Sequence, residues 1–118
     1  MKKKRLLTIE ETPTALVQRQ LNGYNCRNIM SFLETYADDV EIYTFPDQLL
    51  YKGKDELRKN YSKKFEDTPN LHCELLGRMV QGNIVIDKER VQVNNDIIEA
   101  IVIYHIENNK IKKVYFVR

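Results

Sequence analysis

The chain has 118 residues, enough for one domain whose own core needs no disulfide or metal for stability. Nineteen lysines and arginines against seventeen aspartates and glutamates leave a net charge of +2, which is too small to indicate a nucleic acid as the main partner. The basic residues after Met1 lead into no signal-peptide-like apolar segment, and no run is apolar enough for a membrane helix, so no membrane partner is expected.

Residues 1–11 are expected to be an N-terminal extension, partly disordered, and residues 12–118 to form the domain. Thr12-Pro13 favours a helix start, because a hydroxyl can cap the first turn and proline suits the first helical position. The helix is predicted to run to about Asn25. The residues of its inner face recur at three- and four-residue spacing: Leu16, Val17, Gln20, Leu21 and Tyr24.

Asn28 can cap a second, shorter helix, which we expect to end at Ala37-Asp38-Asp39. Its predicted inner face is Ile29, Phe32, Leu33 and Tyr36. Residues 40–45 are β-branched and aromatic and predict a strand that proline stops, and residues 49–51 predict a short return strand. A third helix is then predicted between Gly53 and Thr68, with an apolar stripe at four-residue spacing: Leu57, Tyr61 and Phe65.

The remainder of the chain predicts four strands at residues 71–80, 84–93, 97–106 and 111–117. Asparagine and glycine separate them, and these residues tolerate the positive φ of tight hairpin turns, so antiparallel pairing is expected. A twisted meander bends readily around helices that must bury their apolar stripes. The predicted fold class is therefore α+β, a cone-shaped, mainly antiparallel curved sheet packed on three helices.

Cys26 and Cys73 lie far apart and form no Cys-x-x-Cys motif, which indicates reduced thiols and a cytoplasmic location. His72 precedes Cys73, but neighbouring residues of a strand point to opposite faces, so the two cannot bind one ion. We expect no metal and no cofactor.

Three segments carry a resemblance to a known family: Gln18 to Asn25, Phe32 to Val40, and Gly53 to Arg58. They match the pattern N…(F/Y)ADD-V…G…(I/L)R, the middle segment supplying Ala37-Asp38-Asp39. From Thr14 to Arg118 the chain resembles the nuclear transport factor 2-like superfamily, most closely its bacterial SnoaL-like and steroid Δ-isomerase-like branch. The resemblance implies a cystatin-like cone around an apolar pocket, and it identifies fold better than function.

Ketosteroid isomerase, a member of that superfamily, uses an aspartate base and an oxyanion hole made of a tyrosine and a protonated aspartate. Aligned on the Ala37-Asp38-Asp39 segment, this chain has Gln20 at the tyrosine position and Val102 near the protonated aspartate. The base position falls on Thr44, or on Phe45 if the prolines are matched. None of these side chains can do the isomerase's work, so that mechanism is not expected here.

The resemblance implies a ligand pocket with these candidate residues: Gln20, Tyr24, Tyr36, Thr44, Tyr61, Tyr104 and Phe116. Gln20, Tyr36 and Tyr61 either orient a ligand or form a hydrogen-bonded network inside a filled core. Thr44 is either a pocket hydroxyl or an ordinary strand residue. Arg118 could reach a ligand carboxylate from the rim, or be disordered as the last residue.

Asp87 and Glu89 alternate on one predicted strand, so both side chains leave the same face. If that face is concave, the two carboxylates are candidates for general acid/base catalysis. The alternative is a solvated strand end, since Lys88 and Arg90 surround them while Ile84 and Ile86 supply the core.

The sequence thus predicts a protein that binds a small hydrophobic or oxygenated molecule. One alternative is an isomerase- or cyclase-like proton-transfer enzyme whose base lies at Asp87 or Glu89. Another is a non-catalytic association module. A homodimer is expected in either case, because related proteins commonly pair through the outer sheet face, where Tyr43, Ile103 and Tyr115 could form an apolar patch.

Overall fold

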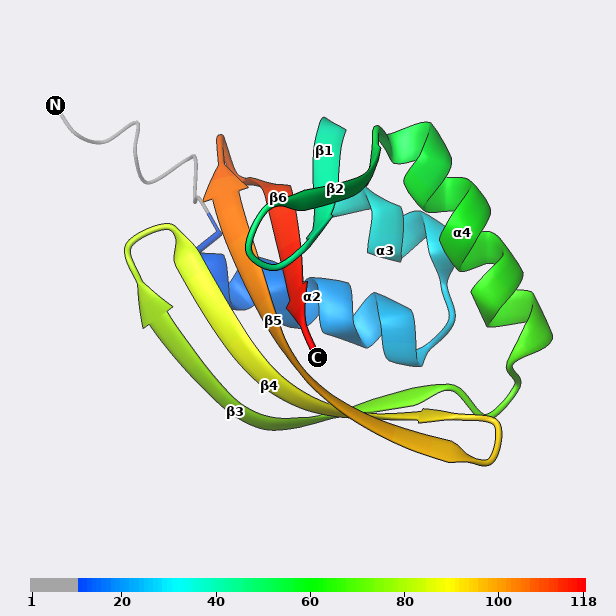
Figure 1. The fold of residues 1–118 in the computed structure, drawn as a ribbon. Helices are drawn as coiled ribbons and strands as arrows, with labels where there is room; N and C mark the ends of the chain where they lie inside the picture. The colour runs from blue at the N-terminus through cyan, green and yellow to red at the C-terminus, as the bar shows by residue number, and fades with distance from the viewer. Residues whose placement is uncertain (1–10) are drawn as a thin grey trace, which may run out of the picture.

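The computed structural model describes residues 11–118, so the extension predicted for residues 1–11 lies outside the described residues except for Glu11. Figure 1 shows three helices gathered on one side of a curved sheet. The helices are α2 (Pro13–Asn25), α3 (Ile29–Glu34) and α4 (Lys54–Asp67). The strands are β1 (Tyr36–Thr44), β2 (Gln48–Lys52), β3 (His72–Gln81), β4 (Ile84–Val93), β5 (Asp96–Glu107) and β6 (Lys110–Val117). Within residues 11–118, every helix is too short or too polar to span a bilayer.

The six strands form one sheet in the order β2-β1-β6-β5-β4-β3. All neighbouring pairs are antiparallel except β1 and β6, which run parallel. Figure 1 shows the long strands β3, β4 and β5 sweeping in an arc past the end of α2, so the concave side faces the helices. The α+β curved-sheet fold predicted from the sequence is confirmed.

The first two helices begin at the predicted caps. The side-chain oxygen of Thr12 accepts a hydrogen bond from the backbone N–H of Ala15, and that of Asn28 accepts one from Ser31. Each cap satisfies a backbone N–H that has no partner inside its helix. These short polar side chains therefore fix the register in which α2 and α3 present their apolar faces to the sheet.

The second helix is shorter than predicted, because α3 ends at Glu34 and Tyr36 already belongs to β1. The Thr35 hydroxyl donates to the carbonyl of Phe32 at 2.7 Å, which closes the last turn. The carbonyl of Thr35 then accepts the backbone N–H of Ile111 on β6 at 2.9 Å. Because the chain pairs with a distant strand here, the helix ends at Glu34. Ala37-Asp38-Asp39 therefore lies within β1 and does not end α3.

The predicted hairpins are present, with left-handed backbone conformations in the turns between the late strands. Asn108 and Asn109 both have positive φ (52° and 62°), as do Gly82 (58°) and Asn94 (57°). These residue types reach that region at low cost, which explains why the turns sit where the sequence places asparagine and glycine.

An aromatic cluster joins the helices to the sheet on the concave side. Phe32 is fully buried at its centre, and its ring centroid lies 4.7 Å from that of Tyr61 and 5.1 Å from that of Tyr36. Tyr24 and Phe65 pack against Phe32 from α2 and α4. Tilted and edge-on contacts of this kind hold α2, α3, α4 and β1 as one body, so the tyrosines that border the site are rigidly supported.

Candidate functional site

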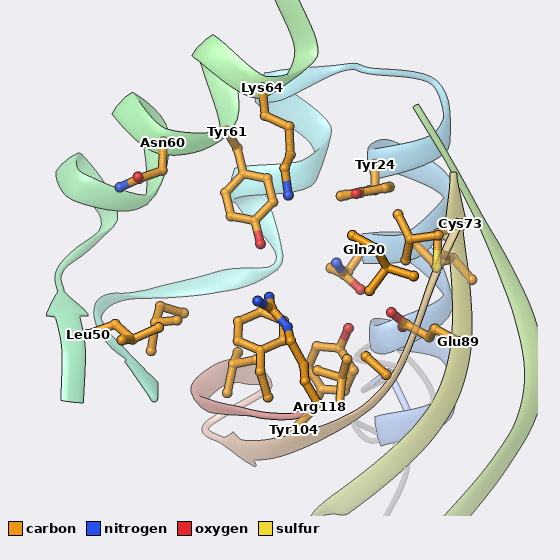
Figure 2. Close-up of a pocket in the computed structure, with 18 of the residues that line it drawn as sticks. Gln20, Tyr24, Leu50, Asn60, Tyr61, Lys64, Cys73, Glu89, Tyr104 and Arg118 are labelled. Carbon is orange, nitrogen blue, oxygen red and sulfur yellow. The ribbon is translucent and has the colours of Figure 1, made fainter. Parts of the chain in front are cut away.

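A cavity of about 370 Å³ lies between the concave face of the sheet and helices α2 and α4. Side chains from all six strands line it (Figure 2), and most of them are aliphatic or aromatic. A volume of a few hundred Å³ with apolar walls and a few polar groups is the usual form of a small-molecule site. The apolar walls come mainly from alternate residues of β4, β5 and β6, as the period of a half-buried strand requires.

The structure places six of the seven candidate pocket residues along this cavity: Gln20, Tyr24, Tyr36, Tyr61, Tyr104 and Phe116. Thr44 is the exception and is corrected here. It shares a strand face with Ile42, which does line the cavity, but it is the last residue of β1 and pairs with Gln48 at the turn into β2. Its β6 partner Phe116 lines the cavity, but Thr44 itself does not.

Gln20 brings an amide group into the cavity from the buried face of α2. Gln20 is 5% exposed, and its amide acts on Tyr36 by lowering the pKa of that hydroxyl, against the larger effect of burial. The amide oxygen, Oε1, has no hydrogen-bond partner within residues 11–118. A buried acceptor without a partner is costly, so this oxygen is a natural site for a hydroxyl or N–H of a bound molecule.

The tyrosines of the cavity keep their protons at neutral pH. Burial raises the pKa of Tyr36, Tyr61 and Tyr104 well above the usual value, and it also raises the pKa of Tyr24. A phenol that stays neutral remains a hydrogen-bond donor. The cavity therefore offers several O–H groups to a ligand oxygen.

Of residues 11–118, Glu89 is the one acidic residue that lines the cavity. It leaves β4 on the concave face and is 7% exposed. Burial raises its pKa to about 7, with the charge of Asp87 adding to the effect, while the thiol of Cys73 and the hydroxyl of Tyr104 beside it act in the opposite direction. Near neutral pH the carboxyl group is therefore divided between its acid and its carboxylate form, as a general acid/base requires.

Asp87 shares the concave face with Glu89 but does not line the cavity, and its candidacy as an acid/base is corrected. The side chain has no exposed surface and holds the Arg78 guanidinium through two hydrogen bonds, Nε–Oδ1 at 2.6 Å and Nη2–Oδ2 at 2.9 Å. Arg78 also donates to Gln18 on α2 at 3.0 Å. Through Arg78, Asp87 on β4 thus links this strand to β3 and α2.

The alternative of a solvated strand end is wrong for β4. Asp87 and Glu89 point inward, whereas Ile84 and Ile86 stand half-buried on the convex side with the exposed Lys88. The charged residues face the interior because their partners are there: Arg78 for Asp87, and the polar groups of the cavity for Glu89.

Four polar residues of the cavity were not among the pocket candidates predicted from the sequence: Tyr51, Asn60, Lys64 and Cys73. Asn60 and Lys64 lie three and seven residues after the buried Leu57 and share its side of α4, although Asn60 is exposed and Lys64 only half-buried. Helical spacing alone could have found them. Cys73 on β3 alternates with Leu71, which comes just before the strand, and both are buried. Tyr51 gave no such signal, because β2 is mostly exposed.

The raised pKa of Glu89 makes the stability of the protein depend on pH. Between the ordinary pKa of 4.5 and the folded value of about 7, the folded state holds a proton that the unfolded state has lost. The contribution of Glu89 is fully present below about pH 4.5 and is lost as the pH rises to about 7, a change of about 3 kcal/mol in the free energy of unfolding.

Glu89→Gln removes this titration, so the stability difference between wild type and variant should shift by about 3 kcal/mol between pH 4.5 and pH 8, in favour of the variant at the higher pH. Urea unfolding of both proteins across that range measures it. A difference that stays constant with pH would show that Glu89 titrates like an exposed glutamate.

A sheet curved over three helices, with a lined cavity at its concave face, defines the class of nuclear transport factor 2-like and cystatin-fold proteins. The SnoaL-like domain family matches residues 17–114, and the chain belongs to that family. No curated protein matches the sequence. The resemblance stated from the sequence segments is therefore confirmed.

Solved structures of low sequence identity share the fold. An uncharacterised cystatin-fold protein from Novosphingobium aromaticivorans has a TM-score of 0.84 at 18% identity, over 92% of this chain and 99% of that one. A proposed ketosteroid isomerase from Kribbella flavida has a TM-score of 0.76 at 15% identity, over 94% and 80% of the two chains. An LEH-like epoxide hydrolase from M. tuberculosis has a TM-score of 0.70 at 9% identity, over 89% and 80%. At these identities the likeness concerns the fold alone.

Proposed function

We propose that the protein binds an apolar, oxygen-bearing small molecule in the cavity and exchanges a proton with it through Glu89. The observation that carries the proposal is a buried carboxyl group with a pKa of about 7 facing an apolar cavity. Titratable groups perturbed by burial and placed in a cleft are typical of active sites. Two of the similar structures carry the names of an isomerase and an epoxide hydrolase, which is consistent with chemistry in such a cavity.

The proposed step is proton transfer at a carbon next to a carbonyl group. The carboxylate of Glu89 takes the proton from the α-carbon. The C–H electron pair forms a C=C bond, the carbonyl π electrons move onto oxygen, and an enolate or enol forms. Neutral hydroxyls such as Tyr36 and Tyr61 line the same space and can donate to the developing oxyanion. The unpartnered Oε1 of Gln20 can accept the hydrogen of an enol or hydroxyl. Return of the proton from Glu89 completes an isomerisation or an exchange.

The test is deuterium incorporation at the α-carbon of ketones in D₂O, followed by mass spectrometry with a panel of aryl and alicyclic ketones that includes 2-tetralone. We expect exchange above the rate in matched buffer, with a rate that rises with pH around a midpoint near 7. Exchange that never exceeds the buffer rate for any member of the panel would count against the proposal.

A second proposal is self-association through the convex face of the sheet. Tyr43 on β1 and Tyr115 on β6 stack there with ring centroids 4.8 Å apart and planes 16° from parallel, and Ile103 is the β5 partner of Tyr115. These side chains are only half-buried, whereas the helices pack on the opposite face. A flat apolar patch can bury itself against a second copy related by a two-fold axis.

Tyr115→Glu places a charge in this patch and should weaken a dimer by about 30-fold or more, as expected for a central aromatic at an interface. Size-exclusion chromatography with light scattering over a concentration series measures the dissociation constant. Arg58→Glu, exposed on α4 on the other side of the sheet, is the matched charge control. A wild-type protein that stays monomeric at the highest concentration would contradict the proposal.

A further inference from the structure

Two cationic side chains line the same cavity as Glu89, Lys64 in the last turn of α4 and Arg118 just after β6. Figure 2 shows the Lys64 amine and the Arg118 guanidinium reaching from opposite sides into the space beside Tyr61, while Glu89 points in beside Cys73. The charge of Arg118 acts on both Lys64 and Tyr61. The cation that acts on Glu89 is instead Arg78. The cavity thus has a cationic end and a carboxyl end.

Within the described residues, neither of these cations has an acidic partner, whereas other lysines of α4 do. On the same helix Lys59 pairs with Glu56 and Lys63 pairs with Asp67. Lys64 and Arg118, by contrast, form no ion pair with any side chain of residues 11–118. Each lies over an aromatic ring of the cavity instead, the Lys64 amine 5.4 Å from the ring centre of Tyr61 and the Arg118 guanidinium carbon 5.2 Å from that of Phe116.

Two unpaired like charges at an apolar opening are unfavourable for the empty protein. Burial and the neighbouring guanidinium both lower the pKa of Lys64, so the charged ammonium form is destabilised in this position. An anion between the two groups would remove the repulsion and form charge-assisted hydrogen bonds with both. A guanidinium fork suits the two oxygens of a carboxylate, and an ammonium group can complete the contact.

We infer that the ligand is an apolar anion, with a carboxylate or similar oxyanion held between Lys64 and Arg118 and its uncharged end directed toward Glu89. The inference rests on the proposed function and adds the charge of the substrate to it. An anionic group at the Glu89 end would meet a like charge whenever that carboxyl group ionises. The same arrangement therefore sets the orientation of the molecule, because only the uncharged end can approach the acid/base.

The experiment compares two fluorescent probes with the same aromatic body, the anion 8-anilinonaphthalene-1-sulfonate and the neutral N-phenyl-1-naphthylamine. Wild-type protein should bind the anionic probe about tenfold more tightly or better, and the preference should shrink at high salt. Lys64→Gln with Arg118→Gln should weaken the anionic probe by about tenfold or more and change the neutral probe within about twofold. Lys63→Gln, one residue away on the exposed side of α4, is the matched control and should change neither.

The outcomes separate this inference from the proposed function. Equal binding of the two probes, or an equal loss of both in the double variant, would overturn the anionic ligand while leaving the cavity and Glu89 in place. Glu89→Gln should keep the preference for the anionic probe. Wild-type protein that prefers the anionic probe but exchanges no protons with the ketones would overturn the proton transfer alone. If neither probe binds, the anionic ligand is overturned, and the exchange assay decides the proton transfer separately. Each single variant, measured by the same titration, guards against a folding defect in the double variant.

Discussion

Replacing Glu89 with glutamine is expected to slow deuterium exchange into bound ketones by about 10²–10⁴-fold. Glutamine has nearly the same shape as glutamic acid, but it cannot take up a proton. The loss should fall on the turnover rate more than on ligand binding, because the neutral amide fills the same volume as the protonated acid. Mass spectrometry of deuterium in the ketone, over a series of ketone concentrations, gives both the turnover rate and the apparent affinity.

The same assay needs a control that removes a carboxylate without touching the cavity. Glu74→Gln serves this purpose, since Glu74 lies on β3 with its side chain exposed beside Arg90 on the convex face. Its exchange rate should stay within about twofold of wild type. Full turnover by the Glu89→Gln protein, with the control also active, would show that the proton goes to another group.

The fold could be predicted because its determinants are local in the sequence. The capping residues Thr12 and Asn28 and the asparagine turns around Asn108 act on their own neighbours, and the structure has elements at those places. The end of α3 could not be predicted, because it depends on the bond between Thr35 and Ile111, two residues far apart in the chain. A contact between residues this far apart does not change the helical spacing of apolar residues that predicted Tyr36 on the second helix.

The site was predictable to a different degree on helices and on strands. Stripe positions such as Gln20 and Tyr61 follow from helical spacing, which also marks Lys64. On β4 the alternation shows that Asp87 and Glu89 share a face, but it does not show which face is concave. Their different roles depend on Arg78, which β3 brings opposite Asp87 through pairing that only the folded sheet defines.

The second large effect concerns the buried ion pair beside the site. Asp87→Asn should lower the free energy of unfolding by about 3–5 kcal/mol, because the Arg78 guanidinium, only 11% exposed, would lose the negative charge that compensates it. The asparagine amide also turns two N–H donors toward a group that has only donors to offer. Urea unfolding at pH 7.5 measures the loss, and the exchange assay should show Glu89 still active in whatever fraction remains folded.

A charge removed from the surface gives the comparison that this prediction needs. Glu99→Gln breaks two exposed pairs on the same sheet, with Arg90 and with Lys88, and should cost no more than about 1 kcal/mol. A double variant, Asp87→Leu with Arg78→Met, should recover most of the stability lost in Asp87→Asn, because it removes both charges from the interior together. If Asp87→Asn cost no more than the surface variant, the pair would be solvated in solution. The inward face of β4 would then be held by Val85 and its apolar neighbours alone.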